Sequence, residues 1–131
     1  MKVFKLAVLG ILFFSFLSCA PGLVPPGWEF LGKRQVNFGY DHDAIAVPPG
    51  KGLLRQLMIV VTKNDLEMFD MRVTFERGDD FSPNLRLVFE KNTRSRVIDL
   101  PGGVRRVRRV DFRYKSLLLN ERRADIELWG R

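Results

Sequence analysis

The sequence predicts an all-β protein, specifically an antiparallel β-sandwich of about eight strands with a jelly-roll or immunoglobulin-like topology. Apolar and polar residues alternate in at least five segments, and turn residues separate these segments every eight to twelve residues. No long segment shows a helical period. Strands with one apolar and one polar face pack as two antiparallel layers around a common core, which predicts the sandwich.

The first half of the domain contains four expected strands. Two short strands are predicted at Glu29–Asn37 and Ala44–Val47, and a third at Gln56–Thr62. Lys63–Asp65 then predicts a hairpin turn into a fourth strand, Phe69–Glu76, which has the clearest alternation in the chain. Its expected core-facing residues are Phe69, Met71, Val73 and Phe75.

The second half contains four more expected strands, at Leu85–Glu90, Ile98–Leu100, Arg109–Tyr114 and Asp125–Trp129. The break Pro101-Gly102-Gly103 ends the second of them. Apolar residues of these strands alternate with charged ones, and the expected core positions are Leu85, Leu87, Phe89, Val110, Phe112, Tyr114, Ile126 and Leu128.

Residues 1–18 have the organisation of a secretory signal peptide. Lys2 and Lys5 form a positive N-terminal region, and the twelve residues of Leu6–Leu17 form an apolar region. A membrane-spanning helix needs about twenty apolar residues, so this segment is too short for one. We therefore expect the mature chain to be exported.

The motif Phe16-Leu17-Ser18-Cys19 resembles the lipobox of bacterial lipoproteins. This resemblance implies that Cys19 is the lipidated N-terminus and that the lipid joins the protein to a membrane. It also implies a cell-envelope location, facing the periplasm from the outer membrane if the host is Gram-negative. The alternative is an ordinary signal peptide that is cut near Ala20, with Cys19 as a spare thiol.

The mature chain from residue 19 has 113 residues with 20 basic and 15 acidic side chains, a net charge of +5. This length fits one small domain. Residues 19–27 are rich in proline and glycine and predict an extended lipid-anchored tether, followed by the β-sandwich domain at residues 28–131. One histidine and one cysteine exclude a disulfide framework and a zinc cluster.

Four segments of the domain resemble a family of small exported bacterial proteins of unknown function, each a single β-sandwich domain behind a signal peptide. They are WEFLGKRQV at Trp28–Val36, RVIDLPGG at Arg96–Gly103, VRRVDFRY at Val107–Tyr114 and ADIELWGR at Ala124–Arg131. The IDLPG motif and the terminal LWG motif are the most distinctive parts. The resemblance implies an exported β-sandwich, and it supplies no activity and no binding residues.

Positive charge is concentrated in residues 86–115, which hold ten basic and three acidic side chains, a net charge of +7. Guanidinium groups bind phosphate, sulfate and carboxylate groups well. We therefore consider an anion-binding surface for an anionic glycolipid, a polysaccharide or an acidic protein, formed by Arg105, Arg106, Arg108 and Arg109. The alternative is a solvated strand face whose arginines pair with acids on neighbouring strands.

Other candidate sites carry weaker signals. Asp41-His42-Asp43 and Asp79-Asp80 lack the spacing of a metal loop, so we interpret them as polar turn residues and expect no metal and no cofactor. No serine or cysteine lies in a nucleophile motif, so we expect no catalytic residues and no enzyme activity. Trp28 and Trp129 are expected to pack at one edge of the sandwich or, alternatively, to form a platform for sugars.

These observations together predict a non-catalytic envelope module, either binding or structural, with a basic strand face. The alternative is a carbohydrate-binding jelly-roll module. We expect no nucleic acid partner, because few aromatic residues are interleaved with the basic ones.

Overall fold

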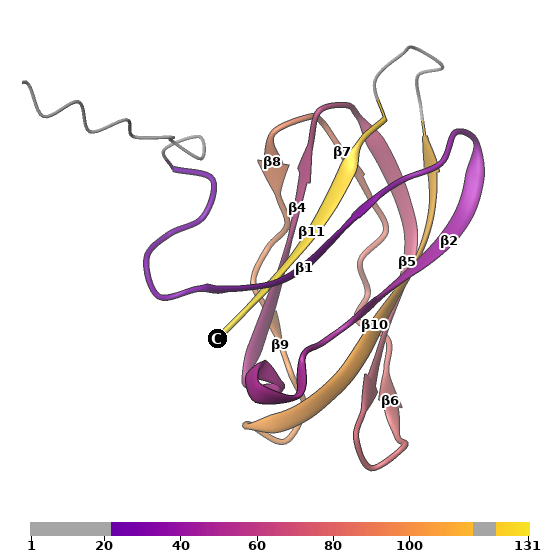
Figure 1. Cartoon of the computed structure of the whole chain (residues 1–131). Helices are drawn as coiled ribbons and strands as arrows, with labels where there is room; N and C mark the ends of the chain where they lie inside the picture. Colours follow the sequence, from indigo (N-terminus) through magenta and orange to yellow (C-terminus); the bar gives the residue numbers. More distant parts are fainter. Residues whose placement is uncertain (1–21, 117–122) are drawn as a thin grey trace, which may run out of the picture.

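The computed structural model describes residues 22–116 and 123–131. In these ranges the chain forms two antiparallel β-sheets that lie face to face (Figure 1), which confirms the predicted all-β sandwich. The predicted signal peptide, residues 1–18, and the predicted lipidation site Cys19 lie outside the described residues. Within the described ranges, no helix is long and apolar enough to cross a membrane.

The first sheet has the order β1-β11-β4-β8, and β9 also pairs with β4. Its strands are β1 (Glu29–Gln35), β11 (Asp125–Gly130), β4 (Gln56–Thr62), β8 (Thr93–Arg94) and β9 (Ile98–Asp99). The final strand, β11, therefore lies between β1 and β4, as Figure 1 shows.

The second sheet has the order β2-β10-β5-β6, with β3 beside β10 and β7 beside β5. Its strands are β2 (Tyr40–Ala46), β10 (Arg105–Ser116), β5 (Leu66–Phe75), β6 (Asp80–Phe81), β3 (Leu53–Leu54) and β7 (Leu87–Phe89). A short 3-10 helix, η1 (Pro49–Lys51), connects β2 to β3.

One edge of each sheet is broken into short strands: β8 and β9 beside β4, and β6 and β7 beside β5. Ser95 separates β8 from β9, and its hydroxyl accepts a hydrogen bond from the Ile59 N–H at 2.9 Å. The Ser95 N–H in turn donates to the Ile59 carbonyl at 2.8 Å. A side chain thus replaces a backbone acceptor where the edge bends, which keeps the buried backbone of β4 satisfied. Such breaks explain why the described strands outnumber the expected ones.

The core lies between the two sheets and is built from the alternating apolar residues. Met71, Val73 and Phe75 of β5 are buried, as predicted. The predicted core positions of β10 and β11 are also confirmed, since each is almost completely buried. They are Val110, Phe112, Tyr114, Ile126 and Leu128.

The turn Lys63–Asp65 is not a hairpin turn, contrary to the sequence prediction. It follows β4, which pairs with β11, β8 and β9, and precedes β5, which pairs with β10, β6 and β7. The turn therefore carries the chain from one sheet to the other. Lys63 adopts a left-handed backbone conformation, with φ of 74°, which allows the chain to reverse tightly there.

Phe69 lies on the outer face of β5, so its predicted core position is wrong. Tyr114 pairs with Met68 while Arg113 pairs with Asp70, so Phe69 is an extra residue in a β-bulge. The bulge inverts the alternation, and Met68 is buried instead. The Phe69 ring stacks on Tyr40, with ring centroids 5.6 Å apart.

Leu87 is the second misplaced core residue, because its side chain is 41% exposed. It begins the three-residue edge strand β7, whose other end, Phe89, is buried as predicted. Leu85, just before β7, is also buried. The strand is too short to hold a regular alternation across all three positions.

Candidate functional site

The four arginines of the predicted anion surface do not lie together on one surface. All are in β10, but Val107 pairs with Phe75 while Arg109 pairs with Thr74, so the strand is irregular at Arg108. Arg105 and Arg106 border a hollow at the end of the sandwich. Arg106 and Arg108 border a second hollow, and Arg109 borders a third.

Arg105 is held in place by three groups. Its guanidinium lies 2.5 Å from the Asp79 carboxylate, donates to the Pro101 carbonyl at 3.1 Å, and lies 3.8 Å from the centroid of the Phe75 ring. The hydrogen bond from Arg105 lowers the pKa of the Asp79 carboxyl. Arg105 therefore bridges the loops on either side of this hollow and has few donors left for a ligand.

Two of the other three arginines also have acidic partners. Arg106 lies 3.1 Å from Glu76, and Arg109 lies 3.1 Å from Asp111. Arg108 is exposed and has no ion-pair partner in the part of the chain that the structure describes. This arrangement matches the alternative of a solvated strand face with internal pairs, while binding of an anion by these arginines stays a prediction.

The outer face of the second sheet is a network of paired polar and charged side chains. His42 lies 3.1 Å from Asp111, and Arg113 lies 3.7 Å from Asp70. Exposed pairs of this kind each contribute about 0–1 kcal/mol to the free energy of unfolding. The network gives the sheet a polar surface and leaves few free charges for a ligand.

Asp41-His42-Asp43 lies in strand β2, so its interpretation as turn residues is wrong. The three side chains do not converge on one point: Asp41 accepts a hydrogen bond from the Asn37 amide and Asp43 accepts one from the Tyr114 hydroxyl at 2.6 Å, whereas His42 lies beside Asp111. In the ranges that the structure describes, no three histidine, cysteine, aspartate or glutamate side chains gather as metal ligands.

A groove with aromatic walls lies on the outer face of the first sheet. We call it the aromatic groove, and its volume is about 660 Å³, within the usual range for small-molecule sites. Its lining residues are Gly22, Leu23, Val24, Pro25, Trp28, Phe30, Val60, Thr62, Asn92, Glu127 and Trp129. Both tryptophans of the chain are among them.

Trp129 is fixed in the groove by its neighbours. It pairs with Phe30 across β1 and β11, and the two rings meet edge to face with centroids 5.3 Å apart. The Trp129 indole N–H donates to the Glu127 carboxylate at 2.9 Å. Edge-to-face packing and a hydrogen-bonded indole together orient the ring rigidly.

Trp28 is held at the other side of the groove. The Arg131 guanidinium lies 4.4 Å from the centroid of its indole, and Arg131 Nε donates to the Gln56 side-chain carbonyl at 2.7 Å. Leu23 is half-buried in the groove wall together with its neighbours Val24 and Pro25. Part of the predicted tether therefore packs against the domain.

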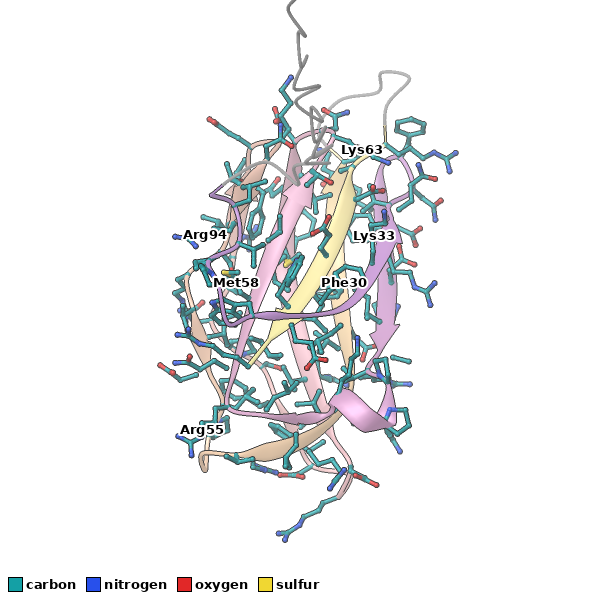
Figure 2. All side chains as sticks on the ribbon, turned by 60° about the vertical axis from the view of Figure 1, so that its left-hand side comes forward. Phe30, Lys33, Arg55, Met58, Lys63 and Arg94 are labelled. Carbon is teal, nitrogen blue, oxygen red and sulfur yellow. The ribbon has the colours of Figure 1, made fainter. Side chains whose placement is uncertain are left out.

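The floor of this face is apolar although it points away from the core. Met58 and Val60 of β4 are each 1% exposed, yet neither belongs to the cluster between the sheets. Figure 2 shows Met58 and Phe30 on this face. The sequence predicted a possible sugar platform at Trp28 and Trp129 but not the rest of the groove. Strand β4 carried a signal for it, because a strand with apolar residues on both faces needs a cover on its outer side.

A comparison with protein-family models matches residues 7–130 to a domain of unknown function, DUF2541. The chain belongs to the DUF2541 family. This membership agrees with the resemblance to an uncharacterised family, and it assigns no activity to the DUF2541 domain. A search of curated proteins gives no match.

Among solved structures, the DUF2541 chain is similar to one from a study of the structure and function of Pseudomonas aeruginosa AlgX. The TM-score is 0.40 and the sequence identity is 9%. The alignment covers 78% of this chain and 26% of the AlgX chain. A likeness at this level carries no argument about the function of the DUF2541 domain.

Proposed function

We propose that this DUF2541 domain is a non-catalytic, exported binding module and that its ligand is a saccharide held in the aromatic groove. One observation carries the proposal: Trp28, Phe30 and Trp129 border a single groove that also contains a carboxylate and an amide side chain. Aromatic faces pack against the C–H faces of sugar rings, and polar groups at the edge bind the hydroxyls.

The polar groups suit sugar hydroxyls. Glu127 uses one carboxylate oxygen for the Trp129 indole, which leaves acceptor capacity on that carboxylate for a ligand hydroxyl. Thr62 and Asn92 add side chains that both donate and accept hydrogen bonds. A sugar hydroxyl needs both kinds of partner, so this set supports a saccharide over a purely apolar ligand.

The proposal includes lipidation of Cys19 and a cell-envelope location. Gly22, at the rim of the aromatic groove, is three residues from Cys19. Three residues span at most about 11 Å, so a lipid on Cys19 would hold the groove close to the membrane surface. The ligand would then be a saccharide of the envelope.

Tryptophan fluorescence tests the proposal directly, because both tryptophans line the groove and no other tryptophan contributes a signal. Residues 19–131 would be titrated with neutral and acidic oligosaccharides. We expect a saturable change in emission, and we expect Phe30→Ala to weaken binding. The matched control is Phe69→Ala, which removes a half-exposed aromatic ring from the other sheet and should leave binding unchanged.

Thermal unfolding of both variants must show that the fold is retained. If no saccharide in the panel changes the emission of the parent protein, the proposal is wrong. Equal loss of binding in Phe30→Ala and Phe69→Ala would also contradict it, because the effect would then not belong to the groove.

A second candidate function is the binding of an anionic glycolipid or an acidic protein by the arginines of β10. The observation that favours it is the exposed guanidinium of Arg108, which has no ion-pair partner among residues 22–116 and 123–131. It is the weaker candidate because Arg105, Arg106 and Arg109 each pair with an acid.

A further inference from the structure

We infer that the saccharide of the aromatic groove is acidic and that Arg94 binds its carboxylate. This inference rests on the proposed function and names the class of ligand that the groove selects. It follows from the position of Arg94, from its lack of a partner, and from the charges around the groove.

Arg94 stands beside the groove on the same face of the sheet. It pairs in register with Val60, which lines the groove, and directly opposed residues of two antiparallel strands share one face. Asn92, two residues earlier in the chain, also lines the groove. Arg94 therefore lies on the outer face of the first sheet, next to the groove-lining strand β4 and separated from Phe30 by β4 and β11 (Figure 2).

Arg94 is an exposed guanidinium with no hydrogen-bond or ion-pair partner in residues 22–116 and 123–131. Arg105 and Arg109, by contrast, form ion pairs with Asp79 and Asp111. A free guanidinium presents its donors in a planar fork that matches a carboxylate. Arg94 thus has the capacity for an anion that the paired arginines of β10 lack.

Among the other charged side chains around the groove, positive ones outnumber negative ones. Lys63 and Lys33 share one buried carboxylate, Asp125, at 2.8 Å and 3.9 Å. Figure 2 shows Lys33, Lys63 and Arg94 placed around Phe30 and Met58. Arg131 adds a further cation over Trp28. A surface of this kind favours a ligand with negative charge.

The mixture of groups favours an acidic sugar over a simple anion. Glu127 lies inside the groove and would repel a small anion there, whereas it accepts a hydrogen bond from a hydroxyl. A sugar ring stacked on the aromatic wall can direct a hydroxyl to Glu127 and a carboxylate outward to Arg94. Glu127 thus binds a hydroxyl and repels the carboxylate, whereas Arg94 binds the carboxylate.

The experiment compares two ligands of equal length, a galacturonate trimer and the neutral galactose trimer, by tryptophan fluorescence at low salt. We expect the parent protein to bind the acidic trimer about tenfold more tightly, as a charge-assisted hydrogen bond would give. Arg94→Gln should remove this preference and leave the neutral trimer unaffected. Arg94→Lys should restore part of it, because lysine keeps the charge but not the fork.

Arg77→Gln is the matched control. Arg77 is exposed in the turn between β5 and β6, on the other sheet, and it also lacks an ion-pair partner in the described part of the chain. The variant removes the same charge, so a loss equal to that of Arg94→Gln would show a general effect of net charge and overturn the inference.

The outcomes separate this inference from the proposed function. If both trimers bind equally and Arg94→Gln changes nothing, the acidic ligand is ruled out while the saccharide groove stands. If neither trimer nor any other saccharide changes the emission, the proposed function fails and the inference fails with it.

Discussion

At the scale of single residues, the Tyr114 hydroxyl joins two parts of the chain. It is buried, donates to the Asp43 carboxylate at 2.6 Å and accepts a hydrogen bond from the Asn37 N–H at 3.1 Å. It therefore ties the loop between β1 and β2 to strand β10. Burial, and then the hydrogen bond to Asp43, raise the pKa of Tyr114 far above its ordinary value of 10.0.

We predict that Tyr114→Phe lowers the free energy of unfolding by about 1–3 kcal/mol, because Asp43 and the Asn37 N–H lose a partner. Urea denaturation at pH 7 measures this change. The control is Tyr40→Phe, since Tyr40 is 72% exposed and should tolerate the change. Equal stability of the Tyr114 variant and the parent would show that the hydroxyl does not secure the loop.

The raised pKa of Tyr114 also makes the free energy of unfolding of the parent protein depend on pH, with a decrease at alkaline pH. In the unfolded chain the hydroxyl ionises near pH 10, whereas in the folded protein it keeps its proton. The stability from this group is therefore full below about pH 10 and is lost as the pH rises above it. Urea denaturation between pH 8 and 11 should show a steeper fall for the parent than for Tyr114→Phe.

At the scale of elements, the question for strand β10 is whether its arginines bind an external anion or only pair with acidic side chains of the domain. We predict that changing Arg105, Arg106, Arg108 and Arg109 together to Gln lowers the free energy of unfolding by up to about 3 kcal/mol, because three ion pairs are lost. Retention on heparin at about 0.15 M salt should change little. Abolished retention with unchanged thermal stability would instead support an anion surface on β10.

Alternation predicted the elements well wherever a strand is regular. It placed Val73 and Phe112 in the core correctly, because a strand face repeats every two residues. It failed at Phe69, because one extra residue in a bulge inverts the alternation and no residue type in the sequence indicates the bulge. It also failed at Lys63–Asp65, because a tight turn looks the same whether the next strand stays in the sheet or crosses to the other one.

The candidate site was only partly predictable for a related reason. Trp28 and Trp129 were both noted as a possible sugar platform, yet they are a hundred residues apart, and only the pairing of β1 with β11 brings their strands together. Period-two patterns assign faces to strands but not neighbours. Arg94 lay within the basic segment, and nothing in the sequence distinguished it from the paired arginines.

At the scale of the whole molecule, the expected lipid anchor determines where the domain is found. We predict that the protein, expressed in a host with lipoprotein processing, is recovered in membranes with a modified N-terminus at Cys19. For the Cys19→Ser variant, we expect no processed lipoprotein in the membrane fraction. Mass spectrometry that finds an unmodified N-terminus at or beyond Ala20 in the parent protein would contradict lipidation.

The central position of β11 has a consequence for the order in which the domain is completed. The last strand in sequence is inserted between β1 and β4, and it supplies Trp129 and Glu127 to the groove. During synthesis the amino-terminal strands emerge first, and the first sheet lacks β11 between β1 and β4 until that strand is made. Contacts between segments so far apart in the sequence form slowly, so the groove proposed to bind the saccharide is complete only after β11 has paired with β1 and β4.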